Sequence, residues 1–216
     1  MNAFTPMRMI SDKLNCMVVA LALLTITTSA NAWILTLTPG AKQIYLQVGN
    51  GTYTGGNYNA GGTPANNATI NVVSLSVPAA ALGNGTPQPM TSNSTAANSF
   101  YDGYNTCNPP NQVYVGGWAR VPGSAGSAVM SVSTPANLVN GAGDTIPFSK
   151  ISWASTANGN TTPDIAAGTF NGSSITLANI AVNTWVEDCL TFSYANSTTV
   201  AAGTYVGRAV YTLSLP

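Results

Sequence analysis

The sequence predicts an all-β protein, an antiparallel β-sandwich. Over most of the chain, apolar residues alternate with polar ones at a spacing of two, which is the period of a strand with one buried face. Clusters of Gly, Asn, Pro and Ser separate these segments and are typical of turns. Helix-like composition is confined to residues 78–83, which allow one turn at most. Many short strands separated by turns favour a sandwich over a helical or mixed fold.

The predicted strands are rich in Val, Thr, Tyr, Trp and Ile. In chain order they span residues 69–77, 112–121, 127–133, 145–155, 174–182, 184–194 and 203–216. Asn171-Gly172 lies between two apolar pairs, residues 169–170 and 175–176, and this spacing predicts a two-residue hairpin turn.

The first 32 residues have the organisation of a cleaved secretory signal peptide. Arg8 and Lys13 supply positive charge, residues 16–26 form a short apolar run, and residues 30–32 read Ala-Asn-Ala, an A-x-A cleavage site. Cleavage there is expected to leave a mature chain that begins at Trp33. The apolar run is shorter than the roughly 20 residues of a membrane-spanning helix, so we expect no membrane span in the mature chain.

The mature chain is almost uncharged. Its charged residues are Lys42, Arg120, Lys150, Arg208, Asp102, Asp144, Asp164, Glu187 and Asp188, for a net charge of −1. Nucleic-acid binding requires clustered Lys and Arg to neutralise phosphates, so no nucleic-acid partner is expected.

Catalytic and metal chemistry have few candidate residues. The chain contains no His, and the only adjacent acids, Glu187 and Asp188, are expected to point to opposite sides of a strand. General acid–base work requires a tuned base or paired carboxylates. We therefore expect no enzyme, no cofactor and no metal site.

Cys107 and Cys189 are the two cysteines of the mature chain. In an exported protein two cysteines predict one disulfide. A metal or nucleophilic pair is the less favoured interpretation, because no His accompanies them.

In the last predicted strand, residues 203–216, the alternation of side chains predicts that one face points toward the core. The core-facing residues are expected to be Tyr205, Gly207, Ala209, Tyr211, Leu213 and Leu215. The sequence ends within this strand, so no later segment is expected to cover its outer edge. An unpaired edge either receives another strand or aggregates.

These features together resemble the fimbrial (pilus) major subunits of the chaperone–usher type in Gram-negative bacteria. The features are the signal peptide, a Gly-, Asn- and Thr-rich β domain, an alternating apolar N-terminus and, most specifically, GTYVGRAVYTLSLP at residues 203–216. The resemblance implies an immunoglobulin-like sandwich that lacks its last strand and is completed by a donor strand from a neighbouring subunit.

Carried onto this sequence, the resemblance assigns residues 33–41 to the donor strand, with an extension to residue 48 as the alternative, and residues 42–216 to the pilin domain. The donor side chains would be Trp33, Ile34, Leu35 and Leu37, and the acceptor groove would be lined by Tyr205, Ala209, Tyr211, Leu213 and Leu215. Its partners would be copies of itself in a helical homopolymer, with a periplasmic chaperone and an outer-membrane usher during assembly. The filament would pass through the periplasm and lie on the cell surface.

Two alternatives stay open. Pro39-Gly40 fits the centre of a type II turn, which would join residues 33–38 and 42–48 as a hairpin within one molecule. The protein could also be a secreted monomeric carbohydrate-binding or adhesive module, since aromatic ring faces suit sugar faces. The residues for such a platform are Trp118, Trp153, Trp185, Tyr53, Tyr58, Tyr101 and Tyr104.

Several asparagines begin an N-x-S/T sequon and are candidate glycosylation sites. They are Asn50, Asn67, Asn84, Asn93, Asn160, Asn171 and Asn196.

Overall fold

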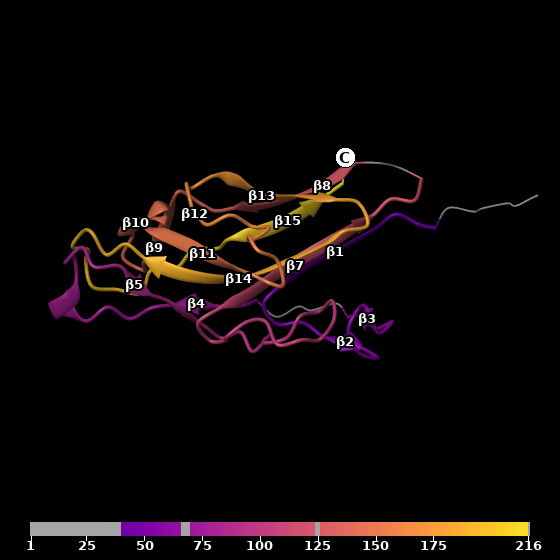
Figure 1. Ribbon diagram of the computed structural model, residues 1–216. Helices are drawn as coiled ribbons and strands as arrows, with labels where there is room; N and C mark the ends of the chain where they lie inside the picture. The colour runs from indigo at the N-terminus through magenta and orange to yellow at the C-terminus, as the bar shows by residue number, and fades with distance from the viewer. Residues whose placement is uncertain (1–39, 66–69, 124–125, 216) are drawn as a thin grey trace, which may run out of the picture. The chain divides into compact units, whose positions relative to one another are not determined.

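The computed structural model describes residues 40–65, 70–123 and 126–215 (Figure 1). The chain divides between Thr38 and Pro39, and every described residue belongs to the second part. The predicted signal peptide, the donor residues 33–38, the proposed turn at Pro39 and the sequon at Asn67 lie outside the described residues. Within them the fold is all-β, with antiparallel sheets and two single-turn 3-10 helices.

The largest sheet has six strands. Its order is β1 (Gln43–Val48), β7 (Val113–Arg120), β14 (Trp185–Tyr194), β11 (Ile151–Ala157) and β12 (Gly168–Thr169), with the short β5 (Gln88–Pro89) also pairing with β14. All its pairings are antiparallel.

A second sheet has three antiparallel strands in the order β13 (Ser174–Ala181), β8 (Ser127–Ser133) and β15 (Val210–Ser214). The register of β15 on β8 runs from Val210 opposite Ser133 to Ser214 opposite Val129. The β13–β8 pairing has a bulge between Thr176 and Ala178.

The remaining elements are short. They are the pairs β2 (Tyr53–Thr54) with β3 (Thr63–Pro64), β4 (Val73–Ser74) with β6 (Thr91–Ser92) and β9 (Asn137–Val139) with β10 (Thr145–Pro147), and the 3-10 helices η1 (Ala79–Ala81) and η2 (Phe148–Lys150). The single helical turn expected within residues 78–83 is confirmed by η1.

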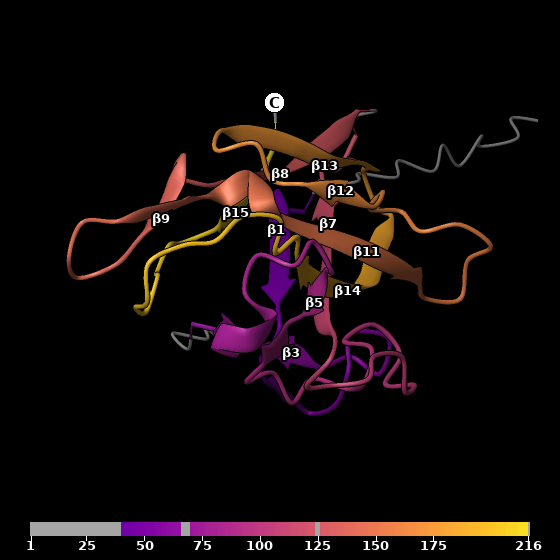
Figure 2. The ribbon, with the colours of Figure 1, turned by 90° about the vertical axis from the view of Figure 1, so that its left-hand side faces the viewer.

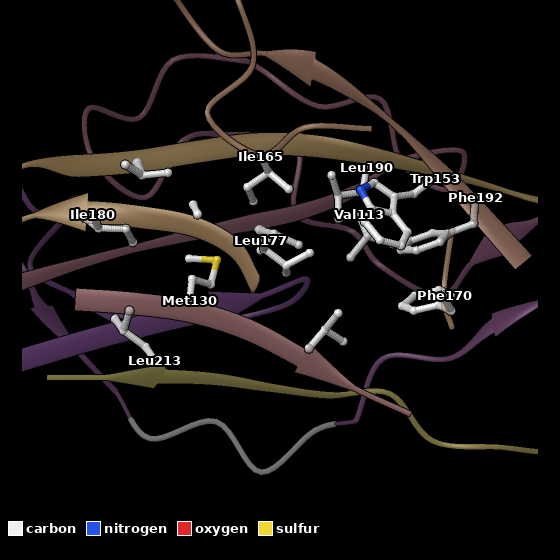
Figure 3. Packing of buried hydrophobic residues seen from close by; sticks show 14 of the residues in the cluster. Val113, Met130, Trp153, Ile165, Phe170, Leu177, Ile180, Leu190, Phe192 and Leu213 are labelled. Carbon is white, nitrogen blue, oxygen red and sulfur yellow. The ribbon is translucent and has the colours of Figure 1, made fainter. Parts of the chain in front are cut away.

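The two large sheets share one hydrophobic core because alternate residues of their strands point toward each other. The six-stranded sheet contributes Val113, Val115, Ala119, Val186, Leu190, Phe192, Ile151 and Trp153, and the three-stranded sheet contributes Ala128, Met130, Val132, Leu177, Ile180 and Leu213. Figure 3 shows part of this core: labelled side chains of both sheets, such as Leu190 and Met130, meet between the strands together with Ile165 and Phe170 from the connecting segments.

The opposite, outer face of the six-stranded sheet is covered by the long segment between β1 and β7. Figure 1 shows this segment, which contains β2 to β6, lying on the side of the sheet away from β8 and β13. A second cluster forms there from Tyr114, Cys107 and Cys189, with Phe100 and Ala96 packed against it.

The strands over residues 112–121, 127–133, 174–182 and 184–194 form close to the predicted bounds. The prediction for residues 69–77 is wrong beyond Val73 and Ser74, and the apolar Ile70 and Val72 of that segment are exposed. In the rest of the segment Val73, Leu75 and Val77 are partly buried and Ser74 and Ser76 are exposed, so the alternation marks a partly buried face without a longer strand.

Residues 145–155 do not form the single continuous strand that the sequence predicts. The chain turns through η2 at Phe148 after Pro147, so the segment forms two strands, β10 and β11, in different sheets. Phe148 enters the main core in that turn.

The predicted strand over residues 203–216 is shorter in the structure. It pairs with β8 of the three-stranded sheet from Val210 onward. The residues before Val210 lie against β9 instead, where Val206 forms a bridge with Val139. Figure 2 shows β9 and the yellow segment before β15 extending to the same side.

The hairpin predicted at Asn171-Gly172 is also wrong. β12 pairs with β11 and β13 pairs with β8, so this turn carries the chain from one large sheet to the other. Gly172 has φ +71°, and a Cβ there would lie 2.7 Å from Cα of Ala136, so the turn requires glycine.

Candidate functional site

The candidate assembly site is formed by two edge strands, β1 of the six-stranded sheet and β15 of the three-stranded sheet. Among the described residues β1 pairs only with β7, and β15 pairs only with β8. The two strands are in contact with each other, so both unpaired edges lie on the same side of the shared core. We call this feature the open edge.

Apolar side chains line the open edge without being fully buried. Leu46 and Val48 of β1, together with Ala209, Tyr211 and Leu215 in and beside β15, are partly buried and pack against the main core. Within β15 only Leu213 is buried, whereas Val210, Thr212 and Ser214 are exposed. At the open edge, apolar side chains that pack against the core therefore remain partly accessible to solvent.

The predicted acceptor residues divide into two groups. Ala209, Tyr211, Leu213 and Leu215 lie at the open edge as the alternation predicts, and burial raises the pKa of the Tyr211 hydroxyl. Tyr205 precedes β15, and its hydroxyl donates a hydrogen bond to the carbonyl of Ala201 at 2.9 Å. Tyr205 therefore belongs to the segment beside β9 and is not part of the β15 ladder.

Among the described residues, neither strand of the open edge carries the usual protection of an exposed strand. Edge strands are commonly blunted by Lys, Pro or a bulge, but β15 reads Val-Tyr-Thr-Leu-Ser and pairs with β8 in an unbroken register. β1, which reads Gln-Ile-Tyr-Leu-Gln-Val, likewise pairs with β7 without a bulge.

The predicted disulfide is confirmed. Cys107 and Cys189 are bonded across 82 residues, and both are buried. The bond joins the covering segment to β14 at the centre of the six-stranded sheet. A closed loop of this length restricts the unfolded chain by about 4 kcal/mol in the entropy model.

A buried carboxylate, Glu187, organises the outer face beside the disulfide. Its oxygens accept hydrogen bonds from side chains of four residues: Ser99 (2.7 and 2.9 Å), Tyr114 (2.5 Å), Asn158 (2.5 Å) and Trp185 Nε1 (2.8 Å). Burial and the neighbouring Glu187 charge raise the pKa of Tyr114 well above its usual value. Sequence reasoning missed this network because its members come from distant segments and carry no spacing motif.

Eight aromatic rings form one continuous set, which we call the aromatic cluster, and two of them, Tyr114 and Trp185, donate hydrogen bonds to this carboxylate. Its members are Tyr45, Tyr53, Tyr58, Phe100, Tyr101, Tyr114, Trp118 and Trp185. Of the residues weighed for a sugar platform, Trp153 lies in the main core instead. Tyr104 is exposed and has no ring contact among the described residues.

Asp188, the neighbour of Glu187, points to the other side of β14, as alternation predicts. Its Oδ2 accepts a hydrogen bond from the backbone N–H of Ile165 at 2.5 Å, while its buried Oδ1 has no hydrogen-bond partner among the described residues. Burial raises the pKa of Asp188 to about 6. The described residues contain no group of three or more His, Cys, Asp or Glu side chains placed to hold a metal ion.

The candidate glycosylation sites differ in accessibility. Asn84, Asn93, Asn160 and Asn171 are exposed, and Asn50 is partly buried. Asn196 is fully buried, and its amide nitrogen donates hydrogen bonds to the carbonyl of Ala81 at 2.8 Å and to Asn84 Oδ1 at 2.9 Å. Glycosylation of Asn196 does not fit the folded domain, because its amide nitrogen is enclosed.

No protein-family model, curated protein or solved structure matches this chain. In the part of the chain that the structure describes, no helix has the length and apolar character needed to cross a membrane.

Proposed function

We propose that this protein is the structural subunit of an extracellular filament, in which an immunoglobulin-like β-sandwich is completed by a strand from a neighbouring copy. The observation that supports this most strongly is the open edge. An unpaired, unprotected strand is a template for a further strand, and strand addition is an established mode of recognition.

The predicted donor has the pattern that the open edge needs. In residues 33–38 the side chains of Trp33, Leu35 and Leu37 share one face, while Thr36 and Thr38 share the other. A strand added beside β15 would turn the first set toward Tyr211 and Leu213 and leave the threonines in water. Ile34 falls on the outward face in this arrangement.

The length of the donor segment and the free energy of burying its side chains also fit the addition of a strand at the open edge. Six donor residues extend about 20 Å, which matches an edge strand of ordinary length. Full burial of three or four large apolar side chains contributes roughly 5 to 10 kcal/mol. Backbone hydrogen bonds along the ladder fix the direction of the added strand.

Such a contact propagates. Each copy would donate its N-terminal segment to one neighbour and accept a segment at its open edge from another, so the interface is heterologous and builds a helical homopolymer. By the resemblance, a periplasmic chaperone would protect the open edge before an outer-membrane usher delivers the subunit to the cell surface.

The test compares donor variants in protein that begins at Trp33. The parent is expected to form filaments in negative-stain microscopy and to elute from gel filtration as polymer. Replacing Leu35 and Leu37 together with Asp places two charges on the core-facing side of the donor, so single subunits are expected. Protein that begins at Gln43 lacks the donor and is expected to behave likewise.

The matched control is Thr36→Asp with Thr38→Asp, which adds the same charge to the same segment on its outward face and is expected to polymerise. If the parent and the Leu35 and Leu37 variant both elute as monomers, the segment folds back as a hairpin at Pro39-Gly40 and the filament proposal fails. Equal polymerisation of both would also contradict it, because assembly would then not use this strand.

A further inference from the structure

Two tyrosines of the aromatic cluster reach the surface of the covering segment. Tyr58 and Tyr101 are each 37% exposed, while Trp118 of the same cluster is buried. Their rings are nearly parallel, with an interplanar angle of 25° and centroids 6.0 Å apart. They therefore present aromatic surface to solvent above an aromatic floor.

That floor holds the two tyrosines in place. The Tyr58 ring centroid lies 5.2 Å from those of both Trp118 and Trp185, and the Tyr101 centroid lies 5.4 Å from that of Trp185. The same indole, that of Trp185, therefore packs against both tyrosine rings.

Hydrogen bonds tie the same residues to the scaffold. Glu187 accepts hydrogen bonds from Trp185 Nε1 and from Ser99 Oγ. Ser99 Oγ in turn accepts a hydrogen bond from the backbone N–H of Tyr101 at 3.0 Å. The two tyrosine loops are also joined directly, since the Tyr58 N–H donates to the Phe100 carbonyl at 3.0 Å. The surface is preformed, and preformed surfaces lose little entropy on binding.

The chemistry of this surface suits a sugar. The hydroxyls of Tyr58 and Tyr101 have no hydrogen-bond partner among the described residues, so each ring offers an apolar face and a free polar group. A pyranose has the complementary pattern of an apolar C–H face and a rim of hydroxyls.

The charges near this surface select against acidic ligands. Asp102 follows Tyr101 directly, and the Glu187 carboxylate lies beneath Trp185. A negatively charged glycan would be repelled by both groups. We propose that Tyr58 and Tyr101 form a binding site for neutral pyranose units of a glycan, a function that goes beyond filament assembly.

The test uses the purified protein with three neutral hexasaccharides (cellohexaose, maltohexaose and mannohexaose) and with acidic hexagalacturonate as the charged comparison. Binding is followed by tryptophan fluorescence and calorimetry. At least one neutral hexasaccharide is expected to bind more tightly than the acidic one. Tyr58→Ala and Tyr101→Ala are each expected to weaken binding by about tenfold.

Tyr104→Ala is the matched control, because Tyr104 lies in the same loop as Tyr101, is 75% exposed and is not a member of the aromatic cluster. It is expected to bind within about twofold of the parent. Tyr58→Phe and Tyr101→Phe keep the aromatic rings and serve as the test if the alanine variants fail to fold. They are expected to lose only the part of the affinity that the hydroxyls supply.

Three results would overturn the proposal: no neutral hexasaccharide binds, the acidic one binds best, or Tyr104→Ala weakens binding as much as the cluster variants. If the parent binds no sugar and the Tyr58 and Tyr101 variants lose self-association, the occupant of this surface is a second copy of the chain.

Discussion

Glu187 and Asp188 are neighbours in β14, and both are buried, but they face opposite sides of the same sheet. Glu187 lies on the outer face and accepts hydrogen bonds from Ser99, Tyr114, Trp185 and Asn158. Asp188 lies on the core side and accepts one from Ile165, with its second oxygen unpartnered among the described residues.

The difference shows how one sheet tolerates carboxylates on both faces. A buried charge is costly unless hydrogen bonds replace its lost hydration. On the outer face, hydrogen bonds from four side chains replace the lost hydration of the Glu187 carboxylate. On the core side this replacement is sparse, and the pKa of Asp188 rises to about 6, which favours the neutral acid.

The largest effect is expected from Glu187→Ala. The change leaves the buried donors of Ser99, Tyr114 and Trp185 without their acceptor, and an unpaired buried donor costs its full desolvation free energy. We expect the free energy of unfolding to fall by about 3 to 5 kcal/mol. Urea unfolding followed by tryptophan fluorescence measures it.

Glu187→Gln is the control, because it keeps the shape and one acceptor oxygen, and it is expected to lose clearly less stability. A loss below about 1 kcal/mol for Glu187→Ala would show that the outer network contributes little beyond ordinary surface contacts.

A smaller effect, dependent on pH, is expected from Asp188. Its pKa is about 6 in the folded protein and about 4 when unfolded, so the folded state binds more protons between these values. The contribution of Asp188 to the free energy of unfolding should therefore be largest below pH 4 and fall, by on the order of 2 to 3 kcal/mol, as the pH rises through 6. Urea unfolding at pH 4 to 7 measures the slope, and Asp188→Asn should remove this contribution.

Leu190→Ala is the comparison from the same strand and the same face. It is expected to lower stability by about 2 to 5 kcal/mol at every pH without changing the slope. If Asp188→Asn keeps the parent slope, another group carries the pH dependence.

The smallest effect is expected from Ser155→Ala. The Ser155 hydroxyl, opposite Leu190 on β11, is buried without a hydrogen-bond partner among the described residues. Removing it should raise the free energy of unfolding by about 0.5 to 1 kcal/mol, as thermal and urea unfolding can measure.

Ser99→Ala is the outer-face counterpart. Ser99 Oγ donates to Glu187 and accepts from the Tyr101 N–H, so its loss should destabilise by about 1 to 3 kcal/mol. Equal losses for the two serine variants would contradict the contrast between the faces.

The sequence predicted the all-β class, the long central strands and the disulfide, because alternation and cysteine count are local or compositional signals. It failed where partners decide the outcome: residues 69–77 alternate but find a pairing partner only at Val73 and Ser74, and the turn at Asn171-Gly172 joins two sheets. The alternation of residues 209–215 predicted the side chains of the open edge. The Glu187 network required contacts between residues up to 88 positions apart, which no local pattern reports.

The Cys107–Cys189 bond encloses most of the domain's long strands within one covalent ring, including β7, β8, β11 and β13. A protease that cuts an exposed loop inside this ring leaves both pieces attached, so the nicked molecule keeps its full mass until it is reduced. In an oxidising environment, where disulfides persist, a copy cut in one of these loops would shed no fragment.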